Sequence, residues 1–441
     1  MSLKSKIKRA EKNILKELEK ENLSFVYKKI EVPLIPTINK INNTGFAFDT
    51  KKAKKLSEKF HEESNKISQK IFGIVGKEFN IKSTQQLSKI LFQELNLPTK
   101  GLKKTPGGVI STKESELKKL QGEHQIIDLI LKYRELEKMI TTYIDNLIPQ
   151  VKDGRIYSEL LQLGTTTGRM ASKNPNIQNI PVGGEYGFKI RELFIAPKNK
   201  KLLSMDYSQI ELRLASIISQ DEKLLKFFQE NRDIHSAVAM EIFSEETTES
   251  RKKAKVINFG ILYGMGANAL KINLSTKEHK LELKDAREYI NQYFEKFQGL
   301  AKYIENIKQE TAEKEFTETL YLRKRFFPEI NSKQPFIRAM AERMAINAPI
   351  QGSSADIIKL AMIEIEEYLE KNNLTEKIKI IAQVHDELIF EMDENIEEKN
   401  ILYIKKIMEN ILEQYPPLLK IKKIVPLKIN YSIGTNWAEL K

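Results

Sequence analysis

The sequence contains no cysteine in its 441 residues. That absence excludes disulfide bridges, thiolate zinc sites and cysteine nucleophiles, so a bound metal would need oxygen or imidazole ligands. No apolar run approaches the ~18 residues that a bilayer span requires, and we therefore expect no membrane-spanning segment. Hydrophobic residues form 41% of the chain and charged residues 30%, a balance that disfavours a wholly disordered protein.

The sequence has fewer acidic than basic residues. Lys and Arg number 73 against 60 Asp and Glu, which gives a formal net charge of +13. This excess attracts polyanions at long range, so nucleic acid is the leading expected partner and an anionic membrane surface the second. The length allows roughly three units of about 150 residues each.

The first third of the chain has the pattern of a basic helical module. Apolar residues at helical spacing over 3–18 predict an amphipathic helix and not a targeting signal. The two prolines in 32–36 are expected to interrupt the helical pattern. Residues 51–146 are rich in Lys, helical in period and poor in strand signals.

The remainder resembles an α+β domain. Short β-like runs at 201–205 and 377–384 stand among Gly, Pro and Asn turns. Between and around them, mainly helical patterns cover 208–218, 250–264, 283–308 and 334–347. A helical insertion into an α+β domain is the simplest arrangement.

Two aspartates end β-like runs. Asp206 follows the run 201–205, and Asp386 lies in a two-residue break between two β-like runs, which predicts a hairpin with Asp386 at its tip. If the runs share one sheet, the two carboxylates meet at one edge. Mg²⁺ prefers such oxygen ligands, and two ions roughly 3.5 to 4 Å apart can serve nucleotidyl transfer. The alternative is ordinary turn formation, for which Asp is well suited.

A stripe of four side chains follows one predicted helix. Arg251, Lys255, Phe259 and Tyr263 are four residues apart each time, so at 1.5 Å per residue they span about 18 Å. The stripe is cationic, then aromatic, which matches the phosphates and base of a nucleoside triphosphate. His235 could donate to a phosphate oxygen, although a single His is more often structural. The alternative is an ordinary amphipathic helix with a basic first half.

These positions resemble the motifs of the family A, or polymerase I type, DNA polymerases. Motif A matches 206–213, motif B 251–264 and motif C 383–387, in the family's order. Further matches at 165–169 and 341–359 extend the resemblance, which runs from about Tyr27 to the end. It implies the α+β right-hand polymerase fold, with a palm built on an antiparallel sheet, helical fingers and a helical thumb.

The resemblance also implies domain boundaries. We expect an N-terminal lead-in at 1–44, the thumb at 45–150, a first palm segment at 151–225, the fingers at 226–344 and a second palm segment at 345–441. Only about 44 residues precede the thumb, too few for another domain. We therefore expect neither 3′–5′ nor 5′–3′ exonuclease activity. Leu322 departs from the family, which usually has glycine there.

Residue roles are carried over from the matching motifs. Asp206 and Asp386 would be catalytic and hold two Mg²⁺ ions, with the backbone carbonyl of Tyr207 as a further ligand, and Lys255 would protonate pyrophosphate. The expected nucleotide-binding residues are Gln209, Glu211, His235, Arg251, Lys255, Phe259 and Tyr263. The expected primer–template contacts are Arg169, Arg343, Asn347, Gln351 and His385, and Glu387 is an accessory acidic residue. Glu211 would crowd the 2′-position of the sugar and so favour dNTPs.

The predicted function is a template-directed DNA polymerase that adds dNTPs to a primer 3′-OH and releases pyrophosphate. We expect it to act as a monomer on DNA inside the cell, in the cytoplasm. The main alternative is a non-catalytic protein that binds primer–template DNA; intact Asp206, Lys255 and Asp386 argue against it. An RNA polymerase or reverse transcriptase is a third possibility, and the use of an RNA template stays open.

Overall fold

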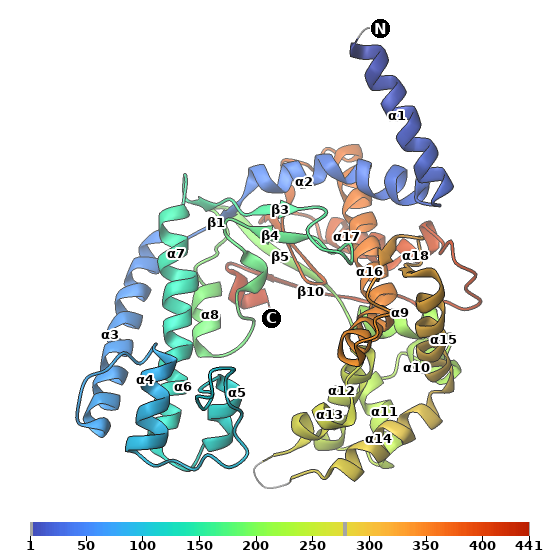
Figure 1. Ribbon diagram of the computed structural model, residues 1–441. Coiled ribbons are helices and arrows are strands. Elements are labelled where there is room, and N and C mark those ends of the chain that lie inside the picture. The colour runs from blue at the N-terminus through green and yellow to red at the C-terminus, as the bar shows by residue number, and fades with distance from the viewer. Residues whose placement is uncertain (1–2, 277–279, 441) are drawn as a thin grey trace. The chain divides into compact units, whose positions relative to one another are not determined.

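The computed structural model describes residues 3–276 and 280–440, which form two compact units (Figure 1). Within the described residues, the first unit comprises 3–44, 159–173 and 199–433, and the second comprises 45–158, 174–198 and 434–440. Each unit gathers segments that are far apart in the sequence.

The first unit contains a four-stranded sheet with the strand order β10-β5-β9-β8. Its strands are β5 (Lys200–Tyr207), β8 (Ile378–Val384), β9 (Glu387–Asp393) and β10 (Ile429–Gly434). Strands β5 and β8 both pair antiparallel with β9. The central strands are buried, which explains their nearly continuous apolar runs. The predicted hairpin at Asp386 is confirmed.

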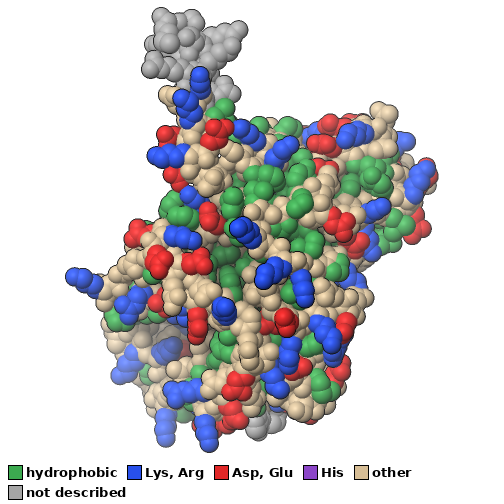
Figure 2. All heavy atoms as spheres, turned by 90° about the vertical axis from the view of Figure 1, so that its right-hand side faces the viewer, with side chains coloured by type: hydrophobic (Ala, Val, Ile, Leu, Met, Phe, Trp, Pro, Cys, Tyr) green, Lys and Arg blue, Asp and Glu red, His purple; other side chains and the backbone are tan. Residues whose placement is uncertain are grey.

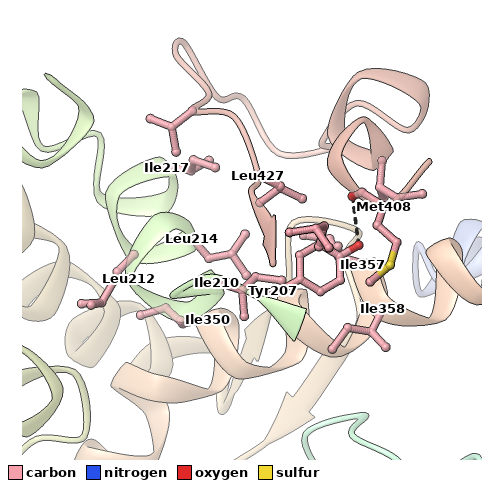
Figure 3. Packing of buried hydrophobic residues seen from close by; sticks show 14 of the residues in the cluster. Tyr207, Ile210, Leu212, Leu214, Ile217, Ile350, Ile357, Ile358, Met408 and Leu427 are labelled. Atoms are coloured by element: carbon pink, nitrogen blue, oxygen red, sulfur yellow. Dashed lines mark hydrogen bonds between the residues drawn. The ribbon is translucent and has the colours of Figure 1, made fainter. Parts of the chain in front are cut away.

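The core of this unit lies where the sheet meets long helices. Tyr207, at the end of β5, packs among Ile210 and Leu214 of α9 (Ile210–Ser219) and Ile357 of α16 (Pro335–Lys371) (Figure 3). Its hydroxyl donates to the carbonyl of Met408 at 3.0 Å, in α17 (Glu398–Glu409). A buried phenol needs such an acceptor. The packing of the ring and the hydrogen bond of the hydroxyl together hold Tyr207, and with it the backbone at the end of β5, in place.

The predicted helices of the first unit are confirmed, with two differences in extent. The pattern at 283–308 is divided at the buried Phe297, and the pattern at 334–347 continues through Pro349 to Lys371. The other helices are α1 (Leu3–Lys20), α2 (Val32–Thr44), α10 (Glu222–Gln229), α11 (Ile234–Phe243), α12 (Thr248–Leu262), α13 (Ala267–Leu274), α14 (Leu283–Lys296), α15 (Gln298–Lys314) and α18 (Ile411–Gln414). Two short hairpins pair β3 (Glu159–Leu161) with β4 (Ala171–Lys173) and β6 (Phe316–Glu318) with β7 (Lys324–Phe326).

The expected interruption at 32–36 is wrong. A π-helical turn over Val26–Glu31 runs directly into α2, which includes Pro33 and Pro36. The prolines therefore lie inside a continuous helical segment, where each removes one backbone N–H donor, at a cost to the helix. Burial of Ile30, Leu34 and Ile38 then outweighs the local preference against a helix.

The second unit is mainly helical, as predicted for 51–146. Its helices are α3 (Thr50–Val75), α4 (Thr84–Lys89), α5 (Glu114–Leu117), α6 (Gln125–Lys138), α7 (Asp145–Leu147) and α8 (Glu185–Arg191), and its strands β1 (Phe46–Ala47) and β2 (Arg155–Ile156) pair antiparallel. Helix α3 packs along α6. Asp49 caps α3 at its start and Gly76, with φ +78°, ends it.

The charged side chains are mixed over the face seen in Figure 2. Lys and Arg alternate there with Asp and Glu, so the basic excess is not gathered into one area of that face. In the part of the chain that the structure describes, no helix is both long enough and apolar enough to cross a membrane.

Candidate active site

Two carboxylate-bearing segments meet at one end of the β5–β9 pair. Asp206 on β5 lies directly opposite Glu387 on β9, and Glu387 follows Asp386 in the hairpin turn. The backbone N–H of Tyr207 donates to the carbonyl of Asp386 at 3.1 Å. The expectation that the two β-like runs share one sheet is therefore confirmed, and the backbone pairing brings the segments of Asp206 and Asp386 together. His385, exposed beside them, has a left-handed backbone with φ +55°, which makes the turn tight.

The surroundings of Asp386 are partly apolar and partly cationic. Burial raises the pKa of its carboxyl group, while Arg169 and a hydrogen bond from Ser354 act in the opposite direction. The Ser354 hydroxyl donates to Asp386 at 3.2 Å. Glu387, in contrast, is buried in the sheet, where Ser204 of β5 donates to its carboxylate. The two neighbouring acidic residues thus have different environments.

A further carboxylate, that of Glu211, is held between a cation and a phenol. It lies in the first turn of α9 and is buried. Arg169 forms an ion pair with one of its oxygens, and the Tyr263 hydroxyl donates to the other at 2.5 Å. Burial raises the pKa of Glu211, and these two partners oppose the rise. Both oxygens are engaged, so the side chain has a fixed orientation.

The stripe predicted on the 250–264 helix lies on α12 and at its end. Arg251 pairs with Asp233 at 2.8 Å, Lys255 is exposed, and Tyr263 caps the C-terminus of the helix. The rings of Phe259 and Tyr263 stack with centroids 6.4 Å apart. Because Tyr263 also contacts Glu211, the aromatic end of the stripe is joined to the start of α9.

His235 lies in the first turn of α11, beside the same stripe. Its ring centroid is 5.8 Å from that of Phe259, and its Nδ1 is 3.1 Å from the Nδ2 of Asn258. Burial lowers the pKa of His235 to about 4; Asp233 opposes this shift, and Arg251 adds to it. The imidazole is therefore neutral at pH 7.

Three of the expected primer–template residues share one stripe of α16. Arg343, Asn347 and Gln351 are four residues apart, with Arg343 exposed and Asn347 nearly buried. The Arg343 side chain lies against Gly264, where an added Cβ would be 2.6 Å from its Cγ. Gln209, the residue before α9, has a left-handed backbone with φ +54°.

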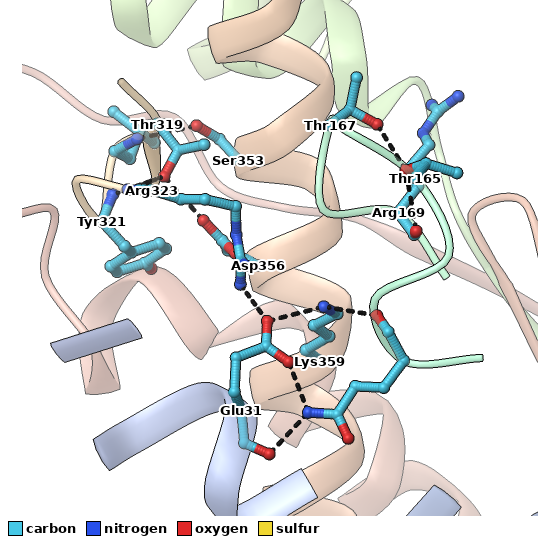
Figure 4. A network of polar contacts seen from close by, with 12 residues as sticks. Glu31, Thr165, Thr167, Arg169, Thr319, Tyr321, Arg323, Ser353, Asp356 and Lys359 are labelled. Atoms are coloured by element: carbon cyan, nitrogen blue, oxygen red, sulfur yellow. Dashed lines mark hydrogen bonds and ion pairs between the residues drawn. The ribbon is translucent and has the colours of Figure 1, made fainter. Parts of the chain in front are cut away.

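The loop that carries Arg169 is held by a buried polar network (Figure 4). Lys359 of α16 donates to the carbonyl of Gln162 at 3.1 Å, and the Gln162 side chain donates to the carbonyl of Glu31 at 2.6 Å. Further along the loop, Thr165 donates to the carbonyl of Arg169 at 2.9 Å. The backbone of the loop is thus anchored on both sides of its turn.

Sequence reasoning missed the supporting residues of this site. Ser354 contacts Asp386, and Asn258 contacts His235, although both stand inside matched motifs. The available signal for Asn258 was a polar residue on the apolar side of a helix. Glu31 gave no local signal, since its partners are far away in the sequence.

The donor set at the sheet edge fits a hard divalent cation. It consists of the carboxylates of Asp206 and Asp386 with the backbone of Tyr207 beside them. Within 3–276 and 280–440, no three His, Asp or Glu side chains gather as a metal group. A site with one or two protein carboxylates, completed by substrate phosphate and water, is the usual arrangement for Mg²⁺.

Comparison with known proteins identifies the family. A model of DNA polymerase family A matches residues 50–439. The chain belongs to DNA polymerase family A. Family A polymerases use divalent metal ions, in agreement with the donor set.

Two relatives from family A are longer than this chain. DNA polymerase I of Caldicellulosiruptor bescii is 40% identical over 443 residues, which cover 99% of this chain and 50% of the relative. DNA polymerase I of Bacillus subtilis is 38% identical over 435 residues, which cover 97% and 47%. The chain thus spans about half the length of these curated relatives.

A solved family A structure has the same fold. The POL domain of Pol1 from M. smegmatis, in a complex with DNA primer–template and dNTP, superposes with a TM-score of 0.88 at 32% identity. The match covers 96% of this chain and 73% of that one. The predicted α+β right-hand polymerase fold is confirmed by this match.

Proposed function

We propose that this chain is a template-directed DNA polymerase that adds dNTPs to a primer 3′-OH and releases pyrophosphate. The observation that carries the proposal is the meeting of Asp206 and Asp386 at one sheet edge, with Glu211, Arg169 and Tyr263 joined beside them. Family membership and the solved neighbour, which holds primer–template and dNTP, support it.

The cofactor in this proposal is Mg²⁺, as two ions. Asp206, Asp386 and the carbonyl of Tyr207 would hold them. When bound, such ions activate the attacking oxygen and stabilise the leaving one during nucleotidyl transfer. Tyr207 serves this role through its backbone, because its side chain is committed to the core.

The triphosphate and base contacts follow the stripe of α12. Arg251 and Lys255 would bind the phosphates, with His235 as a further donor, and Lys255 would protonate the departing pyrophosphate. Phe259 would lie against the sugar and base, and Tyr263 beside the template base. Gln209, just before Ile210, is a further nucleotide contact in this proposal.

Glu211 is the proposed determinant of sugar choice. Because both of its carboxylate oxygens are hydrogen-bonded, the side chain is held in one position, and a 2′-hydroxyl would have to displace it. With Glu211→Ala, the ratio of kcat/KM for dNTP over rNTP should fall. Glu211→Gln keeps the bulk of the side chain and should keep most of the preference. An unchanged ratio in Glu211→Ala would contradict this role.

Primer–template DNA is the proposed macromolecular partner. Arg169, Arg343, Asn347 and Gln351 offer donors suited to the minor-groove acceptors that every base pair presents, so contact there tests pair shape without reading sequence. His385 would lie near the primer end, and Glu387 would act as an accessory acidic group. Because phosphate contacts release counterions, binding should weaken steeply as salt is raised.

Several expectations stay predictions. They are the domain boundaries, the monomeric state, roles in DNA replication and repair, and the absence of exonuclease activity from this chain. Incubation of the pure chain with a primer that carries a 3′ mismatch tests the last of these. Loss of the mismatched nucleotide would contradict it.

The deciding experiment is primer extension on a duplex with a 5′ overhang, using Mg²⁺ and either dNTPs or rNTPs. Wild type should extend with dNTPs, and Asp386→Asn should not. Asp393→Asn is the matched control, because Asp393 lies at the far end of β9, the strand that Asp386 directly precedes, and pairs with Lys200. It should extend like wild type. A wild type that binds the duplex and extends nothing would support the non-catalytic binding protein instead.

A further inference from the structure

Three buried polar side chains connect helices α11, α12 and α14. His235 is 2% exposed, and Asn258 and Tyr293 are both 0% exposed. Asn258 Nδ2 is 3.1 Å from His235 Nδ1, and the Tyr293 hydroxyl donates to Asn258 Oδ1 at 3.0 Å. Polar groups buried to this degree need hydrogen-bond partners, so the orientations of these three side chains are strongly determined.

The imidazole of His235, at one end of this hydrogen-bonded series, is neutral. Its tautomer therefore decides which ring nitrogen can donate a hydrogen bond. A neutral ring carries one proton, on Nδ1 or on Nε2, and the partner of one nitrogen sets the state of the other. The charged neighbours Asp233, Arg251 and Lys255 influence the charge of the ring, and burial dominates in keeping it neutral.

The direction of the hydrogen bonds fixes the tautomer. The Tyr293 hydroxyl has one proton, which it gives to Asn258 Oδ1. The Asn258 amide is thereby turned with its NH₂ toward His235, where it donates to Nδ1. Nδ1 must then be unprotonated, and Nε2 carries the proton. With the amide reversed, Nε2 would present a lone pair, which repels an anionic oxygen.

We infer that Asn258 and Tyr293 are positioning residues that hold His235 in its Nε2–H form, as a donor for an anionic triphosphate oxygen. The inference rests on the proposed nucleotide-binding role of His235. Asn258 directly precedes Phe259 on α12, so the same helical turn that would contact the nucleotide also orients the imidazole.

Ring ¹⁵N NMR of the full chain tests the tautomer without any enzymatic reaction. The chain has five His, and the signals of His235 are assigned by their loss in His235→Gln. Wild type should show a pyrrole-type Nε2 and a pyridine-type Nδ1. Tyr293→Phe removes the proton that orients the amide, so the two ring nitrogens should move toward averaged shifts.

Nucleotide binding provides the second measurement. A dNTP is titrated into the protein with a duplex whose primer ends in a dideoxynucleotide, and the Kd is read from the His235 Nε2 shift. Loss of one oriented hydrogen bond should weaken binding by about 2- to 10-fold in Tyr293→Phe. The control is Tyr289→Phe on the same helix, whose ring packs against Phe243 with centroids 5.1 Å apart. It should keep the tautomer and the Kd.

The outcomes separate the inference from the proposed function. A wild type with protonated Nδ1, or a Tyr293→Phe variant with unchanged tautomer or unchanged Kd, would overturn the positioning role. So would a His235 signal that does not respond to the dNTP. A protein that shows the expected shifts and weakened binding but extends no primer would support the inference while refuting the polymerase.

Discussion

Neutralising Glu31 should destabilise the protein by about 3 kcal/mol, because it leaves two buried cations with one buried carboxylate. Glu31 Oε1 accepts from Lys359 at 2.8 Å and from Arg323, and Arg323 also pairs with Asp356 at 2.7 Å (Figure 4). Burial acts to raise the pKa of Glu31, but Lys359 and Arg323 outweigh it and hold that pKa below its ordinary value. Removing one partner of a buried pair costs about 3 to 5 kcal/mol. Glu31→Gln keeps an acceptor oxygen, which places it at the lower end.

Urea unfolding at pH 7 measures the effect, and Glu19→Gln provides the control. Glu19 forms an ion pair of 3.5 Å with Lys28, and these two side chains are 61% and 50% exposed, against 13% for Glu31. Exposed pairs contribute little because water screens them. The unfolding midpoint of Glu19→Gln should therefore stay where the wild type has it.

A double-mutant cycle tests whether charge balance is the cause. Lys359→Met removes a cation of the same network and should also destabilise strongly. The combined Glu31→Gln and Lys359→Met variant restores the balance between Arg323 and Asp356, so its cost should be smaller than the sum by about 1 to 3 kcal/mol. Additive effects, or a cost of Glu31→Gln below about 1 kcal/mol, would refute this reasoning.

Three further predictions concern backbone space and pH. Gly352→Ala should lower the free energy of unfolding by about 1 to 3 kcal/mol, because its Cβ would lie 2.5 Å from Thr319 Cγ2. Gly73→Ala, whose Cβ would have no atom within 4 Å, should stabilise the protein. Chemical denaturation compares the two variants. Leu322→Gly should stabilise by about 0.5 to 1 kcal/mol, since Leu322 has φ +67°, and Leu322→Ala should bring no such gain in the same assay. The pKa of His235 is lowered to about 4 in the folded protein. The contribution of its neutral imidazole to the free energy of unfolding is therefore complete above pH 6.5 and is lost progressively as the pH falls toward 4. Wild type should thus lose more stability than His235→Gln between pH 7 and pH 5.

The place of each aspartate at the end of a strand could be predicted from sequence because its causes are local. Each aspartate ends an apolar run, and the runs around Asp386 are separated by only two residues. A hairpin that short leaves almost no choice of register. The pairing of β5 with β9 stayed a condition of the prediction, because the apolar runs indicate burial in a sheet but do not specify which strand is the neighbour. The stripe of α12 was equally accessible, because its period is that of one helix.

The polar supports of the site could not be predicted, because they depend on long-range packing. Glu31 is 328 residues from Lys359 and 292 from Arg323. Nothing in the local pattern distinguishes Glu31 from an exposed neighbour such as Glu21. The same limitation explains the error at 32–36. Burial of α2 against distant segments overrides a local preference that, considered by itself, favours a break.

The structure explains why glycine is usual at the position where this chain has Leu322, which the sequence alone does not. Its left-handed backbone closes the turn between β6 and β7, where Leu322 N–H donates to the carbonyl of Thr319 at 3.0 Å. Glycine adopts that conformation without steric cost, which explains a preference for it at this position. The strain of Leu322 is sustained because Arg323, the next residue, is fixed by Glu31 and Asp356. We therefore expect Leu322→Gly to stabilise the Glu31→Gln variant less than it stabilises the wild type, because Glu31→Gln loosens the turn that strains Leu322. The two predictions are coupled through this hairpin.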